Sequence, residues 1–128
     1  MSEKIAFIGL GAMGAPMASN IIKKGKKLSV YDIDQEKMDE VVKIGGTSSS
    51  GISDCVKNAE IVITMLPATE QVKEVLLGEK GVISSLEPGS LIMDMSTIAP
   101  KGTDEICKSC QMHNIDFIDA PVGRLVSH

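Results

Sequence analysis

The chain has 128 residues, 43% of them hydrophobic and 23% charged, and its net charge is −4. This length predicts a single domain spanning residues 1–128, and the composition is that of an ordinary soluble globular protein. The negative net charge argues against binding to nucleic-acid phosphates, and an aromatic content of 2% leaves few platforms for stacking bases. No apolar run is long enough to span a membrane, and the N-terminus lacks a signal-peptide core. Because three cysteines suggest no disulfide framework, we expect a reduced, cytoplasmic protein.

An apolar run near the N-terminus leads directly into a glycine-rich turn. Ile5 to Ile8 predict a strand that is buried on both faces, and Gly9 to Gly14 then spell G-x-G-x-x-G. Apolar residues at helical spacing follow from Met13, and Pro16 falls in the first turn, where its missing N–H costs nothing. The glycines therefore lie between a strand and a helix, as the dinucleotide-binding fingerprint requires.

Each glycine of this turn has a separate task in such a site. Gly9 permits the tight turn, Gly11 lets a pyrophosphate approach the backbone, and Gly14 lets the helix pack close to the strand. The N–H groups of Ala12 and Met13 would point at the phosphates, whose charge the helix dipole favours. The alternative is an ordinary glycine-rich turn without a ligand. The residues that we assign to the cofactor here are Gly9, Leu10, Gly11, Ala12, Met13 and Gly14.

A second predicted strand, Leu28 to Tyr31, ends in an acidic residue. Asp32 follows Gly14 by 18 residues, close to the roughly 20 expected for the acid that binds the adenosine ribose. A carboxylate there can accept both ribose hydroxyl protons and would repel the 2′-phosphate of NADP, so we expect NAD. The alternative is that Asp32 caps the following helix.

The neighbours of Asp32 support the same cofactor. Ile33 and Asp34 stand where an NADP site would want an arginine. Lys37 lies a helical turn further on, and nothing in the sequence aims it at the ribose.

The rest of the chain alternates between strands and helices. Helical spacing or capping signals predict helices over 35–44, 53–58, about 72–76 and 100–112. Short apolar runs predict strands at Ile61–Thr64, Leu91–Asp94 and Ile115–Ile118, and a short strand is expected within 47–51.

This alternation predicts an α/β protein with a doubly wound parallel sheet of strand order 3-2-1-4-5-6. Ligands bind such sheets at the carboxyl ends of the strands. The segments expected to share that rim are Gly9–Gly14, Asp32, Leu66–Pro67, Ser96–Thr97 and Pro121–Arg124.

Two cysteines and a histidine repeat on the last predicted helix. Cys107, Cys110 and His113 have i, i+3, i+6 spacing, which invites a zinc or redox proposal. No second ligand pair accompanies them, and both cysteines lie on the expected packing face. We therefore expect no metal site.

Four motifs together resemble the β-hydroxyacid dehydrogenase family, which includes 3-hydroxyisobutyrate dehydrogenase. The matching segments extend over essentially all 128 residues, and their combination is more specific than the glycine turn alone. These segments are Gly9–Asn20, Met65–Pro67, Asp94–Ile98 and Asp119–Val122.

The resemblance implies a role for several residues. The glycine turn would hold the pyrophosphate, and Leu66 with Pro67 would lie along the ribose and phosphate on the adenosine side. Ser96 and Thr97 would lie near the nicotinamide and the substrate carboxylate. The alternative for this pair is a cap on the following helix, and both roles can hold at once.

The last motif departs from the family pattern. The family continues it with serine and two glycines, whereas this chain has Gly123-Arg124-Leu125. That form resembles the sulfolactaldehyde reductase branch, in which the arginine contacts the substrate sulfonate. Gly123 and Arg124 are therefore predicted to bind substrate; the alternative is that Arg124 is a surface residue.

The resemblance also places important parts of the enzyme outside this chain. The family's catalytic lysine lies beyond the position of His128, and so does its all-helical C-terminal domain. The resemblance therefore implies a cofactor domain that is inactive alone. The full-length protein would be a homo-oligomeric dehydrogenase of a small anionic hydroxyacid or its aldehyde. The alternative is a free-standing module that binds or senses a dinucleotide without catalysis.

Overall fold

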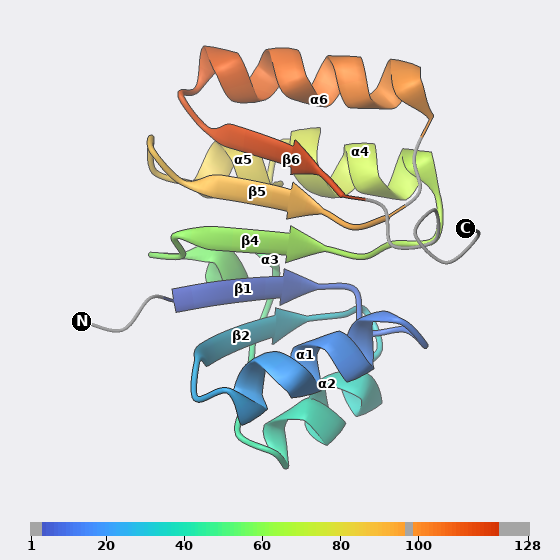
Figure 1. Ribbon diagram of the computed structural model, residues 1–128, viewed down its shortest axis with the longest axis vertical. Coiled ribbons are helices and arrows are strands. Elements are labelled where there is room, and N and C mark those ends of the chain that lie inside the picture. The colour runs from blue at the N-terminus through green and yellow to red at the C-terminus, as the bar shows by residue number, and fades with distance from the viewer. Residues whose placement is uncertain (1–3, 97–98, 121–128) are drawn as a thin grey trace.

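The computed structural model describes residues 4–96 and 99–120. In this part of the chain, six parallel strands form one sheet in the order β3-β2-β1-β4-β5-β6 (Figure 1). The doubly wound order predicted from the sequence is therefore confirmed. The strands are β1 (Lys4–Ile8), β2 (Lys27–Tyr31), β3 (Thr47–Ser48), β4 (Ile61–Thr64), β5 (Leu91–Asp94) and β6 (Asp116–Asp119).

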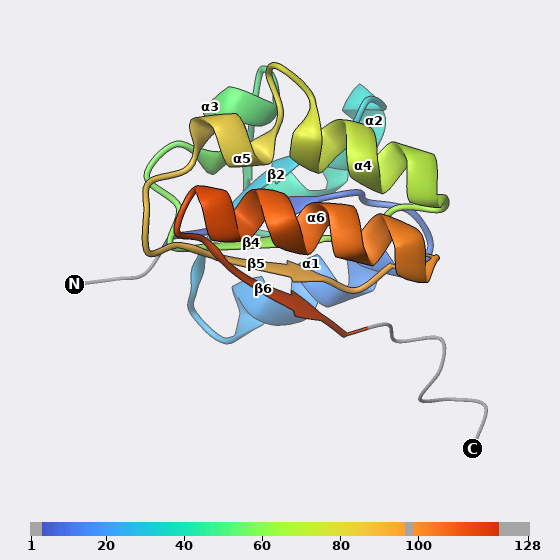
Figure 2. The same ribbon diagram turned by 90° about the horizontal axis from the view of Figure 1, so that it is seen from above.

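Helices cover the sheet from both sides. Figure 2 shows α4, α5 and α6 on one side of the sheet and α1 on the other. None of the helices described is long and apolar enough to cross a membrane. Their bounds are α1 (Gly14–Lys23), α2 (Gln35–Val42), α3 (Ile52–Val56), α4 (Thr69–Leu77), α5 (Val82–Ser85) and α6 (Pro100–Met112).

The central strand β1 supplies side chains to two hydrophobic cores. Ala6 and Ile8 belong to a core built with α3, α4, α5 and α6, whereas Ile5 and Phe7 belong to one built with α1 and α2. Successive side chains of a strand point to opposite faces, so an unbroken apolar run suits a strand that is covered on both sides. The prediction that β1 is buried on both faces is confirmed, because its apolar residues are between 0% and 7% exposed.

A few boundaries differ from those predicted. The four-residue helix α5 was not predicted, because one helical turn is too short to show a periodic pattern. Helix α2 ends at Val42 rather than Ile44, since the chain turns there and reaches a positive φ of 115° at Gly45. Strand β6 begins at Asp116, one residue later than expected.

Candidate dinucleotide-binding site

The glycine turn joins β1 to α1, and two of its glycines are required by the packing. Gly9 has a φ of +102°, and a Cβ added there would overlap the carbonyl oxygen of Met65. A Cβ on Gly14 would overlap the carbonyl oxygen of Gly9 and press on the Phe7 ring at 3.2 Å. These observations agree with a tight turn at Gly9 and a close helix–strand approach at Gly14.

Gly11 differs from both, because the space beside it is open. A Cβ at this position would meet nothing within 4 Å, and the φ of Gly11 is not in the left-handed region. No packing among the described residues therefore requires glycine here. A glycine that leaves such room fits the task of admitting a pyrophosphate against the backbone.

The backbone N–H groups of the turn fall into two groups. The N–H of Gly9 donates to the Tyr31 carbonyl at 3.1 Å, and that of Leu10 donates to Asp32 Oδ2 at 2.7 Å. Within residues 4–96 and 99–120, the N–H groups of Ala12 and Met13 donate to no protein acceptor, and no side chain caps α1, at whose N-terminus they lie. Free N–H groups at a helix N-terminus suit an anion such as a pyrophosphate.

Asp32 connects the end of β2 to the glycine turn. Its Oδ2 accepts the Leu10 N–H, and its Oδ1 accepts the N–H of Asp34 at 2.9 Å. Each carboxylate oxygen keeps a second lone pair, which can accept a ribose hydroxyl. Asp32 does not cap α2, because Asp34 does so by accepting the N–H of Glu36 at 3.0 Å.

A pocket of about 720 Å³ opens over the carboxyl ends of β1, β2 and β4. This volume lies in the range of about 300 to 1,000 Å³ that is typical of ligand sites. The structure thus brings together the glycine turn, Asp32, Leu66 and Pro67, which were predicted to share one rim. Its lining residues are Ile8, Gly9, Gly11, Ala12, Met13, Gly14, Tyr31, Asp32, Ile33, Asp34, Lys37, Ile52, Met65, Leu66, Pro67, Gln71, Glu74 and Val75.

Leu10 belongs to the support of the site rather than to its lining. Its side chain is 2% exposed and packs in the core beneath α1, and its N–H is already bonded to Asp32. Leu10 had been assigned to the cofactor together with the rest of the turn. In the structure its N–H joins the turn to the Asp32 carboxylate, and its assignment to the cofactor stays a prediction.

Sequence reasoning missed several lining residues. Lys37 lines the same pocket as Asp32, although nothing in the sequence predicts that its side chain points there. Gln71 and Glu74 reach the pocket from α4. Helical periodicity places Lys37 one turn into α2, and this was the signal that could have predicted its position at the pocket. The lining residues from α4 could be predicted only from the order of strands in the sheet.

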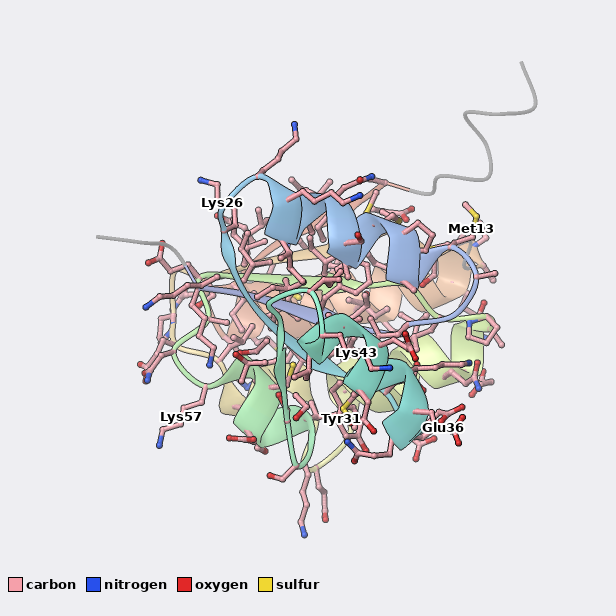
Figure 3. The ribbon with its side chains drawn as sticks, turned by 90° about the horizontal axis from the view of Figure 1, so that it is seen from below. Met13, Lys26, Tyr31, Glu36, Lys43 and Lys57 are labelled. Atoms are coloured by element: carbon pink, nitrogen blue, oxygen red, sulfur yellow. The ribbon has the colours of Figure 1, made fainter. Side chains whose placement is uncertain are left out.

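The lysine cluster that closes α1 lies away from this pocket. Figure 3 shows Lys26 and Lys57 at one end of the molecule, and Met13 and Glu36 at the other. The pocket lies at the end where Met13 is found, so Lys26 is remote from the pocket.

The residues predicted to meet the substrate are only partly described by the structure. Ser96 is 0% exposed and does not line the pocket, and its Oγ accepts the Leu66 N–H at 2.7 Å. Thr97, Gly123 and Arg124 lie outside the described residues. The hydroxyl of Ser96 is thus already engaged in holding the wall of the pocket.

Two of the three residues considered for a metal, Cys110 and His113, have other contacts. Cys110 is buried in the core and His113 Nδ1 lies 2.8 Å from the Ser109 carbonyl oxygen. Burial raises the pKa of Cys110 to about 11, so the thiolate needed by a metal is disfavoured. Among residues 4–96 and 99–120, no three His, Cys, Asp or Glu side chains form a group that would hold a metal.

The fold and this pocket together define a dinucleotide-binding domain of the Rossmann type. Comparison with known proteins specifies the family. Residues 4–124 match the NAD binding domain of 6-phosphogluconate dehydrogenase, and the chain belongs to this family. The resemblance to the β-hydroxyacid dehydrogenases, predicted from the sequence, is confirmed by the relatives that the chain matches.

These relatives are dehydrogenases and reductases. The chain is 44% identical over 120 residues to the 3-sulfolactaldehyde reductase of Escherichia coli strain K12, a match that covers 94% of this chain and 40% of that protein. It is 40% identical over 121 residues to the NAD-dependent L-serine dehydrogenase of Pseudomonas aeruginosa, covering 94% and 41%. The structure of Mycobacterium tuberculosis 3-hydroxyisobutyrate dehydrogenase with L-serine superimposes with a TM-score of 0.86 at 31% identity, covering 94% and 40%. The chain thus spans about two-fifths of the length of these relatives.

Proposed function

We propose that this chain is the NAD-binding domain of an oxidoreductase that interconverts a small β-hydroxyacid or hydroxy-sulfonate and its aldehyde. The observation that carries the proposal is the open space at Gly11, beside the Ala12 and Met13 N–H groups, which donate to no acceptor among the described residues. The names of the relatives support the substrate class. When bound, NAD supplies the hydride acceptor, while the residues of this chain bind and orient it.

NAD is favoured over NADP by the charges at the ribose end of the pocket. Asp32 and Asp34 both line it, whereas Lys37 is the one cation that lines it among the residues described. A 2′-phosphate would meet the Asp32 carboxylate at close range, and such like-charge contacts cost on the order of several kcal/mol. We therefore expect NADH to bind at least about tenfold more tightly than NADPH, which corresponds to about 1.4 kcal/mol.

Paired titrations with NADH and NADPH test this preference. Asp32→Asn combined with Ile33→Arg should narrow or reverse the ratio, because asparagine keeps an oxygen for the Leu10 N–H but loses the charge and the acceptor of the Asp34 N–H. Lys37→Met should weaken residual NADPH binding, whereas Lys43→Met, outside the pocket, is the matched control. Equal affinities of the unmodified chain for the two cofactors would refute the role of Asp32.

The activity of the whole protein is expected to need more than these residues. The family resemblance places the catalytic lysine beyond His128, so we propose that the 128-residue chain binds NAD without oxidising a hydroxyacid. Mixing the pure chain with NAD and candidate hydroxyacids should give no absorbance from NADH. NADH formation that depends on the substrate would overturn this part of the proposal.

Substrate recognition is proposed to involve the segments that follow β5 and β6. Ser96 with Thr97, and Gly123 with Arg124, are the assigned positions, and Arg124 suits a sulfonate, phosphate or carboxylate because its guanidinium fork binds such groups with two hydrogen bonds. In the complete enzyme, Arg124→Ala should raise KM for the anionic substrate far more than KM for NADH. Equal effects on both constants would argue against contact with the substrate.

We also propose that the complete protein is a cytoplasmic, homo-oligomeric enzyme. Size-exclusion chromatography of the complete protein tests its assembly.

A further inference from the structure

A buried polar cluster lies behind the wall of the pocket, where β4 and β5 end. Thr64 and Asp94 are paired in register on these strands, and Thr64, Asp94 and Ser96 are each 0% exposed. Asp94 Oδ1 accepts the Thr64 hydroxyl at 2.7 Å and the Ser96 N–H at 3.3 Å. Ser96 Oγ in turn accepts the Leu66 N–H at 2.7 Å. A continuous hydrogen-bonded path therefore runs from Asp94 to the backbone of a pocket residue.

This path ends on the backbone that supports the glycine turn. Met65 and Leu66 both line the pocket, and the Met65 N–H donates to the Ile8 carbonyl at 3.0 Å. The Met65 carbonyl oxygen lies so close to Gly9 that no Cβ would fit between them. A shift of the Met65–Leu66 segment would thus be transmitted directly to the turn that receives the pyrophosphate.

We propose that Asp94 and Ser96 are positioning residues of the dinucleotide site, which hold the Met65–Leu66 segment in place without touching the cofactor. This inference rests on the proposed function, because it assumes that the pocket binds NAD. It gives Ser96 a role in cofactor binding through Leu66, and it adds Asp94, which was not among the residues predicted for the site.

The cost of burying Asp94 supports a specific role. Its Oδ2 is buried and has no hydrogen-bond partner among the described residues, and an unsatisfied buried polar atom destabilises a fold. Both donors go to Oδ1, so Oδ2 can carry a proton without breaking either bond. Desolvation by burial is the main reason that the pKa of Asp94 is raised, and the Asp119 carboxylate on β6 acts in the same direction. A hydrophobic side chain would avoid this cost, but it could not order the Ser96 backbone.

The test compares two buried serines at opposite ends of β5. Ser96→Ala removes the acceptor of the Leu66 N–H, whereas Ser90→Ala removes a buried hydroxyl that bonds the Glu87 carbonyl at 2.8 Å, outside the pocket. NADH affinity, urea unfolding and hydrogen exchange of the Leu66 amide are measured for both. Ser96→Ala should raise the Kd for NADH about tenfold and speed Leu66 exchange, and Ser90→Ala should do neither. An unchanged Kd in Ser96→Ala would overturn the inference, whatever the loss of stability.

Substitutions at Asp94 provide a second line of evidence. Asp94→Ala should resemble Ser96→Ala in its NADH affinity, and Asp94→Asn should restore part of it, because asparagine keeps an acceptor at Oδ1. If Asp94→Ala is too unstable to fold, the comparison of Ser96→Ala with Ser90→Ala still tests the positioning role. Failure of the unmodified chain to bind NADH would overturn the proposed function and this inference with it. A normal Kd in Ser96→Ala, beside a binding wild type, would overturn this inference alone.

Discussion

The most direct perturbation of the proposed site is Gly11→Val. Chain neighbours aside, a Cβ at residue 11 meets no atom of the described residues within 4 Å, and the backbone there is not in the left-handed region, so the variant should fold normally. Replacing a glycine where the conformation permits can even stabilise a fold by about 0.4 to 1 kcal/mol, because the unfolded chain loses freedom. The new carbon atoms would instead fill the space assigned to the pyrophosphate. We expect the Kd for NADH to rise at least about 100-fold, or about 2.8 kcal/mol.

NADH fluorescence reports the affinity, and urea unfolding followed by circular dichroism reports the stability of the same samples. Gly51→Val is the matched control, because a Cβ there also meets nothing within 4 Å and Gly51 does not line the pocket. Wild-type NADH affinity in Gly11→Val, together with wild-type stability, would show that the pyrophosphate does not cross the turn at this glycine.

Two further predictions concern ionisable groups in the core. The folded-state pKa of Asp94 is raised above the ordinary value of 3.8, so the stability contributed by its proton is complete below that pH and is lost as the pH rises through the folded-state pKa. Urea unfolding should therefore show that the wild type loses stability relative to Asp94→Asn over this rise in pH. A difference in unfolding free energy that stays constant with pH would contradict the raised pKa of Asp94. Burial raises the pKa of both Cys55 and Cys110 to about 11, whereas Cys107 is partly exposed. A thiol reagent at about pH 8, below both raised values, should therefore label Cys107 first and the other two only on unfolding. Rapid labelling of all three in the native protein would refute this.

The strongest sequence signals were those in which local pattern and tertiary environment agree. Unbroken apolar runs predicted β1, β4 and β5 because these strands lie inside the covered sheet. The glycine fingerprint predicted the turn because a Cβ at Gly9 or Gly14 would overlap the backbone. The sheet order followed from the alternation of strands and helices. For the same reason the rim shared by Asp32 and Leu66 could be predicted before the structure.

The remaining parts of the site depend on contacts between distant segments. Leu10 and Asp32 are hydrogen bonded across 22 positions in the chain, and Leu66 and Ser96 across 30. No periodic pattern encodes such a pair. A motif predicts that Ser96 lies near the substrate, whereas its burial and its bond to Leu66 are properties of the packed sheet that no motif reveals. The contribution of α4 to the pocket likewise arises because this helix follows β4, the strand next to β1.

The central position of β1 has a consequence for synthesis on the ribosome. Ile5 pairs with Leu28 on one side and with Ile61 on the other, 56 residues further along the chain. At about 5 to 20 residues per second, one edge of this apolar strand waits roughly 3 to 11 seconds for its partner to be translated. During that interval β1 can pair only with β2, and its unpaired edge is open to contact with other nascent chains. β1 is thus made before β2 and β3 but gains its second neighbour only after both of them, so this apolar strand is a segment for which we expect chaperone contact during translation.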